Sequence, residues 1–177
     1  MTNTWMAPTV VRTEPTRTGG DRESLEQWLD FHRDTLLSKC AGLTAVQLKA
    51  RPVPPSALSL LGLVRHMAEV ERWWFRIHAG NDQIGFQYST DDNQDGDFDD
   101  LDAADAPGDI ETFRREVEAA REAVRDKQLE DVVASHGQDP QQRRNIRWIY
   151  LHMIEEYARH NGHADLIRER IDGAGGD

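Results

Sequence analysis

Residues 145–172 read NIRWIYLHMIEEYARHNGHADLIRERID, and this stretch decides the fold. Its apolar residues recur at intervals of three and four, which is the spacing of one face of an amphipathic α-helix. Asn145 suits the N-cap of such a helix, and Gly173 suits its C-cap. The pattern predicts a helix from residue 142 or 145 to residue 171. A glycine inside a helix costs about 1 kcal/mol relative to alanine, so we expect Gly162 to mark close packing or a slight bend.

Three other segments show the same periodicity. We expect helices over about residues 21–42, from Ser56 or Ser59 to Gly80, and over 109–127. The second of these is apolar over much of its circumference, which predicts a well-buried helix. A short helical turn is expected at 43–48, capped by Thr44, and a further short element at 129–133. Because no period-two pattern occurs, we predict no strand, and the fold class is an all-α four-helix bundle.

The remaining segments define the domain organisation. Residues 1–20 carry prolines and glycines without periodicity, which predicts an irregular leader, and residues 173–177 predict a frayed tail. Residues 21–172 form one bundle domain. A long connection rich in Asp and Gly spans residues 81–107, and a connection of this length is usually functional or mobile. Its acidic stretch, residues 91–105, is typical of a solvated loop. Gly137 and Pro140 mark a second break.

Composition limits the classes of function. The chain has 177 residues and a formal net charge of -11, which argues against nucleic acid as a partner because phosphate binding needs a basic surface. No apolar run is long enough for a membrane span, and the N-terminus lacks a signal pattern, so we expect a cytoplasmic protein without a membrane partner. Cys40 is the one cysteine. It has no activating neighbour on its own helix face, and we expect it to pack near the core.

The residues with the clearest chemical potential lie on the last predicted helix. His152, Glu156, His160 and His163 fall within about 80° of arc on one face. Adjacent pairs among them have the spacing of two metal ligands one helical turn apart. A metal centre needs a third ligand from elsewhere, and His66, on the buried second helix, is the best candidate. The alternatives are a hydrogen-bonded core histidine and surface ion pairs at i, i+4.

Three other features have weaker interpretations. Glu69 lies one turn from His66 and could be a fourth ligand, a carboxylate that orients a ligand, or a base. Residues 91–102 imitate part of a calcium-binding loop but lack the usual final Glu and a helix leading into the loop. Residues 73–75 read WWF, and because consecutive residues cannot all face the core, at least one should cover a neighbouring element, a pocket or a dimer partner.

The sequence resembles the DinB-like superfamily. SLLGLVRHMAEVERWW, at residues 59–74, is similar to the second helix of that superfamily, and residues 145–172 are similar to the fourth helix of its actinobacterial mini-circle protein branch. LEQWLDFHR at 25–33 and GLTxxQL at 42–48 extend the resemblance to nearly the whole chain. It implies a four-helix bundle, often a homodimer, with a divalent metal near one end. The relatives include bacillithiol and mycothiol S-transferases and mycothiol-dependent maleylpyruvate isomerase.

The resemblance also implies a set of metal ligands. They fall on His66, Glu156 and His160, where Glu156 replaces the histidine of many relatives but matches the isomerase branch. We expect Zn²⁺ first, with Ni²⁺ and Fe²⁺ as alternatives, and mycothiol as a cosubstrate beside a small-molecule substrate. A thiol bound at an open metal position would ionise at neutral pH, and Glu69 or His163 could shuttle a proton. The pattern assigns no role to His152.

The resulting functional hypothesis is a metal-dependent, thiol-dependent transferase or isomerase. One alternative is a non-catalytic dimeric bundle that binds a metal or a small molecule. Another is a member that has lost its metal. An open coordination position facing a reachable cavity would favour an enzyme, whereas a closed four-ligand site or a filled pocket would favour a binding or structural role.

Overall fold

The computed structural model describes residues 4–133 and 143–175. Their regular structure is almost entirely helical, as predicted. The elements, in chain order, are α1 (Asp21–Cys40), α2 (Ala45–Lys49), α3 (Leu60–Glu71), the π-helix η1 (Arg72–Ala79), α4 (Gly96–Asp99), α5 (Ala106–Val124), β1 (Val132–Val133), β2 (Arg144–Asn145) and α6 (Ile146–Asp172). No helix of the described residues is long and apolar enough to cross a bilayer.

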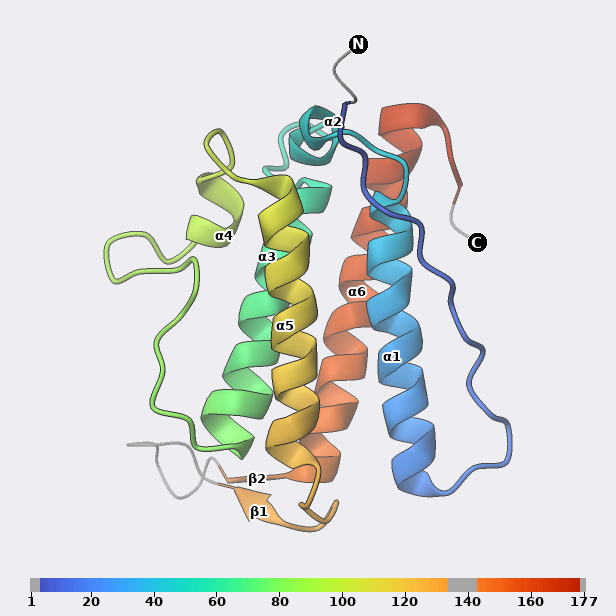
Figure 1. Ribbon diagram of the computed structural model, residues 1–177, viewed down its shortest axis with the longest axis vertical. Helices are drawn as coiled ribbons and strands as arrows, with labels where there is room; N and C mark the ends of the chain where they lie inside the picture. Colours follow the sequence, from blue (N-terminus) through green and yellow to red (C-terminus); the bar gives the residue numbers. More distant parts are fainter. Residues whose placement is uncertain (1–3, 134–142, 176–177) are drawn as a thin grey trace.

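The long helices run lengthwise beside one another, and η1 continues α3 (Figure 1). α1 packs against α6, α3 packs against α5, and α3 also contacts α6. The core between them is built from fully buried side chains on every long helix, among them Leu36, Leu63, Met67, Phe113 and Tyr157. The pairing of α3 with α6 matters most here, because these two helices carry the predicted metal ligands.

Helix ends follow the predicted capping residues. The side chains of Ser59 and Asn145 accept hydrogen bonds from the backbone N–H of Gly62 and Trp148. Thr44 and Gln47 form a reciprocal capping box at the start of α2. Gly173 ends α6 in the left-handed region, with φ of 79°. These local signals place α3 and α6 within a residue or two of the expected starts.

The second half of the second predicted helix differs from the expected geometry. A regular 3.6-residue period would point Trp74 and Ile77 into the core, but the structure buries Phe75, His78 and Ala79 instead. The reason is η1, because a π-helix has a wider turn and rotates the following side chains around the axis. This shift also explains how three consecutive aromatic residues, WWF at 73–75, are accommodated. Each ring points into a different environment.

Several other expectations need correction. A two-stranded antiparallel sheet, β1 with β2, exists where no strand was predicted, because two-residue strands are too short to show a period-two pattern. α5 begins at Ala106 rather than at about residue 109, since Pro107 is accommodated in its first turn. Gly162 does not mark close packing: a Cβ at this position would meet no atom within 4 Å. The expected break at Gly137 and Pro140 lies outside the described residues.

The described part of the N-terminal segment has no helix and packs on the helices. Met6 forms an isolated β-bridge with Thr44, and Ala7 is buried. Val10 packs against the core, whereas Val11 is exposed. The first three residues and the last two of the predicted tail lie outside the described ranges.

A buried polar network joins three helices near the middle of the molecule. The Arg33 guanidinium donates two hydrogen bonds of 2.7 Å to the two carboxylate oxygens of Glu71, and the Tyr157 hydroxyl donates a third to Glu71. Glu71 is fully buried. Because Tyr157 directly follows Glu156, this network fixes α6 against α1 and α3 at the level of the candidate site.

Candidate metal centre

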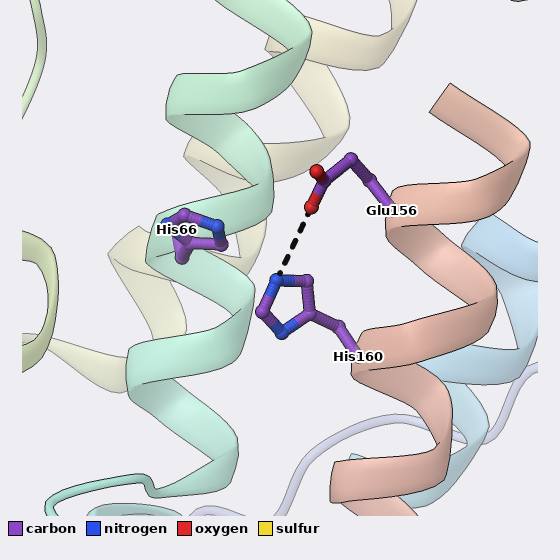
Figure 2. A group of neighbouring side chains, drawn as sticks. All are labelled: His66, Glu156 and His160. Atoms are coloured by element: carbon purple, nitrogen blue, oxygen red, sulfur yellow. Dashed lines mark ion pairs between the residues drawn. The ribbon is translucent and has the colours of Figure 1, made fainter. Parts of the chain in front are cut away.

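Three side chains predicted as ligands converge between α3 and α6. His66 comes from α3, Glu156 and His160 come from α6, and each offers a donor atom within 4.8 Å of the others (Figure 2). All three are partly buried. Bonds of about 2.0–2.2 Å to one cation require donor atoms roughly 3–4 Å apart. The arrangement therefore needs only small side-chain adjustments to hold a divalent cation. Among the described residues, the group has three protein members, which leaves further coordination positions open.

The orientation of His66 is set by Asp97, a residue of α4. His66 Nδ1 lies 2.8 Å from Asp97 Oδ2, and Asp97 is buried. A carboxylate at this distance favours the tautomer in which Nδ1 carries the proton. That tautomer leaves Nε2 as the nitrogen available to a metal. Asp97 was not predicted as a partner of His66, because the acidic stretch at 91–105 has the composition of a solvated loop.

His160 lies between Glu156 and His163. Its Nε2 is 3.5 Å from Glu156 Oε2, and its Nδ1 is 3.4 Å from His163 Nδ1. Burial, together with repulsion from His66, His163 and Arg159, lowers the pKa of His160 to about 4. The ring is therefore neutral at pH 7, which is the protonation state that a metal ligand requires. Two imidazoles and one carboxylate suit Zn²⁺, Ni²⁺ or Fe²⁺.

His152 lies on the other side of Glu156. His152 Nε2 is 3.8 Å from Glu156 Oε1, so the two carboxylate oxygens face different histidines. The His152 ring stacks on Trp148 at 4.9 Å and meets Trp74 edge-on at 4.7 Å. His152, Glu155 and Glu156 form a second group of neighbouring donors, but Arg159 pairs with both glutamates there.

Glu69 does not join the cluster around His66. Its carboxylate accepts hydrogen bonds from the backbone N–H groups of Gln87, Tyr88 and Ser89. These bonds occupy the oxygens that a metal ligand or a base would use. The structural role of Glu69 is therefore to hold the start of the long connection against α3.

Several side chains attach the connection between η1 and α5 to α3. Besides Glu69, Arg65 donates to the carbonyls of Gly96 and Asp100 at 2.9 and 2.7 Å and lies over the Tyr88 ring. Phe98 packs so closely on Gly62 that a Cβ there would approach the ring to 2.9 Å. These contacts place Asp97 beside His66, so the connection is part of the site. Its acidic residues do not gather as a calcium site in the described chain.

A pocket with a volume of about 240 Å³ opens beside His66, between α3, η1 and the connection. Trp73, the first residue of the WWF sequence, lines this pocket, whereas Trp74 faces His152 and Phe75 is in the core. The lining residues are His66, Glu69, Val70, Trp73, Phe86, Ser89, Gln94, Asp95, Asp97 and Phe98. An open pocket next to a candidate metal ligand is an arrangement that a substrate can reach.

Cys40 takes no part in this site. Its side chain is fully buried in α1, and burial raises the pKa of the thiol to about 12. A thiol in this state is neither a nucleophile nor a metal ligand at neutral pH. Any thiol chemistry at the centre would therefore need sulfur from a cosubstrate.

Fold and site together define the class of protein: a helical protein that presents two histidines and one carboxylate, from two packed helices, beside an open pocket. A family model described as Mycothiol-S-transferase matches residues 24–173, which is most of the chain. The chain belongs to the mycothiol S-transferase family, a DinB-like family, in agreement with the resemblance of residues 59–74 and 145–172. Comparison with curated proteins gave no match.

Proposed function

We propose that this protein is a divalent-metal-dependent S-transferase that uses mycothiol as its thiol cosubstrate. The observation that carries the proposal is the convergence of His66, Glu156 and His160, whose donor atoms lie within 4.8 Å of one another beside an open pocket. Family membership supports the thiol and the type of reaction. The donor set fits Zn²⁺ first, and Ni²⁺ or Fe²⁺ as alternatives.

Each residue of the site has a distinct role in the proposed reaction. A divalent cation held by His66, Glu156 and His160 would lower the pKa of a coordinated thiol, so that thiolate is present at neutral pH. Asp97 holds the His66 ring in its metal-binding tautomer. His163, which is partly exposed and 3.4 Å from His160, is placed to accept the thiol proton. Glu69 is not included as a base, because backbone N–H groups occupy its carboxylate.

A non-catalytic, metal-binding bundle would need a different set of metal ligands from an enzyme. A purely structural metal is enclosed by four protein ligands, whereas a catalytic metal keeps a position open for water or substrate. Three donor groups gather here among the described residues, and one of them, His66, also lines the open pocket of about 240 Å³. Both observations support the enzyme. The isomerase alternative gains no separate support from the site.

Metal uptake tests the proposal directly. Protein purified without a histidine tag should contain, or take up, about one equivalent of divalent metal, measured by mass spectrometry of the metal content. His66→Ala and His160→Ala should lose it, whereas His32→Ala, in α1, should retain it. Metal-loaded protein should transfer mycothiol to an electrophile, and the two metal-free variants should not. Absence of metal uptake by the wild type, or full transfer by His66→Ala, would overturn the proposal.

A homodimer and a cytoplasmic location complete the proposal. The dimer follows from the resemblance to a superfamily whose members are often dimeric. Light scattering on the eluate of a size-exclusion column should give twice the mass of the 20.2 kDa chain. A monomeric mass at micromolar concentration would contradict it without affecting the metal centre.

A further inference from the structure

The pocket beside His66 has aromatic walls. Trp73 and Phe86 meet there with their ring centroids 5.4 Å apart, and Phe98 lies 5.0 Å from the His66 ring. They come from two different segments, η1 and the long connection, so a single helix face does not explain their grouping. Phe98 also packs against the core, whereas Trp73 and Phe86 are not part of it. Aromatic side chains that line an open pocket bind flat, apolar groups.

One of these rings is left exposed. Phe86 is 49% exposed, although it lies against Trp73 at the edge of the pocket. A large apolar side chain exposed at the edge of an open pocket gains from contact with a ligand, because contact removes apolar area from water. The exposed ring therefore favours a ligand with an apolar part of its own.

The charges around the pocket are of one sign. Its charged lining residues are Glu69, Asp95 and Asp97, and the described residues that line it include no Lys or Arg. Arg65, the nearest cation on α3, donates to two carbonyls of the connection instead. A ligand that carried a carboxylate into this pocket would meet like charge without a compensating cation among the lining side chains. A divalent cation held with the Glu156 carboxylate and a thiolate would be neutral overall, so the centre would not offset this repulsion, and anions are disfavoured.

We propose that this pocket binds the electrophile, that the electrophile is an uncharged molecule with an aromatic or similarly flat apolar group, and that Trp73 and Phe86 determine this preference. The inference rests on the proposed thiol transfer and names the substrate class of that same site. In the reaction with an aryl halide, a bond forms between the thiol sulfur and the ring carbon. The carbon–halogen bond breaks, the halide leaves with the electron pair, and the thiol proton goes to a base or to solvent.

Equilibrium binding tests the pocket without any catalytic step. The probes are 1,3-dinitrobenzene, which is neutral and has no leaving group, and 3,5-dinitrobenzoate, which adds a carboxylate to the same ring. Quenching of tryptophan fluorescence should show that the neutral probe binds about tenfold more tightly than the anion. Trp73→Phe should remove much of the quenching, whereas Trp28→Phe, a substitution on exposed α1 surface, should not.

Two variants separate the apolar from the electrostatic contribution. Phe86→Ala should weaken binding of 1,3-dinitrobenzene about fivefold, which is the range expected for one aromatic contact. Asp95→Asn should strengthen binding of 3,5-dinitrobenzoate about threefold and leave the neutral probe unchanged. Equal affinity for the two probes, or no effect of Phe86→Ala, would overturn the inference.

Transfer rates distinguish this inference from the proposed function. With mycothiol and metal-loaded protein, 1-chloro-2,4-dinitrobenzene should be preferred about tenfold over 4-chloro-3,5-dinitrobenzoate, after each rate is divided by the uncatalysed rate. If neither is transferred while 1,3-dinitrobenzene still binds, the proposed function is wrong and the pocket assignment stands. If both are transferred equally well, the proposed function stands and the pocket assignment is wrong.

Discussion

Asp97 joins the acidic connection to the proposed metal centre through one hydrogen bond. Its buried carboxylate lies 2.8 Å from His66 Nδ1. Asp97→Ala should lower the affinity for Zn²⁺ about 10- to 100-fold, because the His66 ring loses the partner that fixes its orientation. Asp97→Asn should retain part of the affinity, since the amide oxygen can still accept the bond. Competition with a chromophoric chelator measures both.

The matched control for Asp97 is Asp95→Asn. Asp95 lies in the same pocket lining but forms no hydrogen bond or ion pair with His66, so its amide variant should bind Zn²⁺ like the wild type. Circular dichroism should show the same helical signal for all variants. An unchanged Zn²⁺ affinity of Asp97→Ala would mean that His66 does not depend on this carboxylate.

Cys40 gives a pH-dependent prediction at the same scale. Burial raises the pKa of its thiol from 9.0 to about 12. At pH 8 the folded protein should react with a disulfide reagent roughly a hundredfold or more slowly than the chain unfolded in urea, because far less thiolate is present. Absorbance of the released thiol measures this rate. Comparable rates in the folded and unfolded chains would contradict the assigned burial.

The raised pKa of Cys40 also makes the stability of the folded chain depend on pH in a defined direction. The raised pKa means that the unfolded chain loses the thiol proton at a lower pH than the folded chain does. The contribution of Cys40 is therefore complete below about pH 9 and is lost as pH rises from there towards 12. Cys40→Ala should show a smaller loss of stability over this interval in urea titrations.

At the scale of elements, Glu69 holds the long connection to α3. Its carboxylate accepts the backbone N–H groups of Gln87, Tyr88 and Ser89. Glu69→Ala leaves these donors without their partner, and the free energy of unfolding should fall by about 1–3 kcal/mol. Hydrogen exchange at residues 87–89 should accelerate before global unfolding. Glu111→Ala, an exposed carboxylate of α5, should change neither quantity.

Metal affinity offers a second measurement on Glu69→Ala. If the connection positions Asp97, then loosening the connection should also weaken Zn²⁺ binding, although less than Asp97→Ala does. Normal exchange at residues 87–89 would contradict the structural role of Glu69. A loss of Zn²⁺ binding as large as that of His66→Ala would instead indicate that Glu69 is a metal ligand.

At the scale of the whole molecule, the Arg33, Glu71 and Tyr157 network joins α1, α3 and α6. Glu71→Ala removes the only buried carboxylate that pairs with Arg33 among the described residues and leaves the guanidinium with the partly exposed Asp30, 2.8 Å away, so it should cost up to about 3–5 kcal/mol of stability. Tyr157→Phe removes one hydrogen bond to a charged acceptor and should cost about 1.5–3 kcal/mol. Urea denaturation measures both. A Glu71→Ala variant as stable as the wild type would show that the network is not part of what holds these helices together.

The helices and most of their ends could be predicted because the signals are local. An amphipathic period and capping side chains such as Ser59 and Asn145 act within one or two turns, so a linear sequence contains them. The candidate ligands were predictable for a similar reason. Glu156 and His160 lie one turn apart on one helix, and His66 is a polar residue in an otherwise apolar segment. Their metal-binding role stays a prediction.

Contacts between distant segments were decided only by the tertiary structure. Asp97 meets His66 across 31 residues, and no local property separates it from the acidic residues around it. The π-helical turn at Arg72–Ala79, which sends Trp73 to the pocket and Phe75 to the core, violates the 3.6-residue period used to predict the buried face. The sequence by itself thus determined the helices and the placing of Glu156 and His160 one turn apart on α6, because these depend on neighbours in the chain. The orientation of His66, the aromatic pocket and the roles of Glu69 and Asp97 depend on packing between elements, and only the folded molecule contains that information.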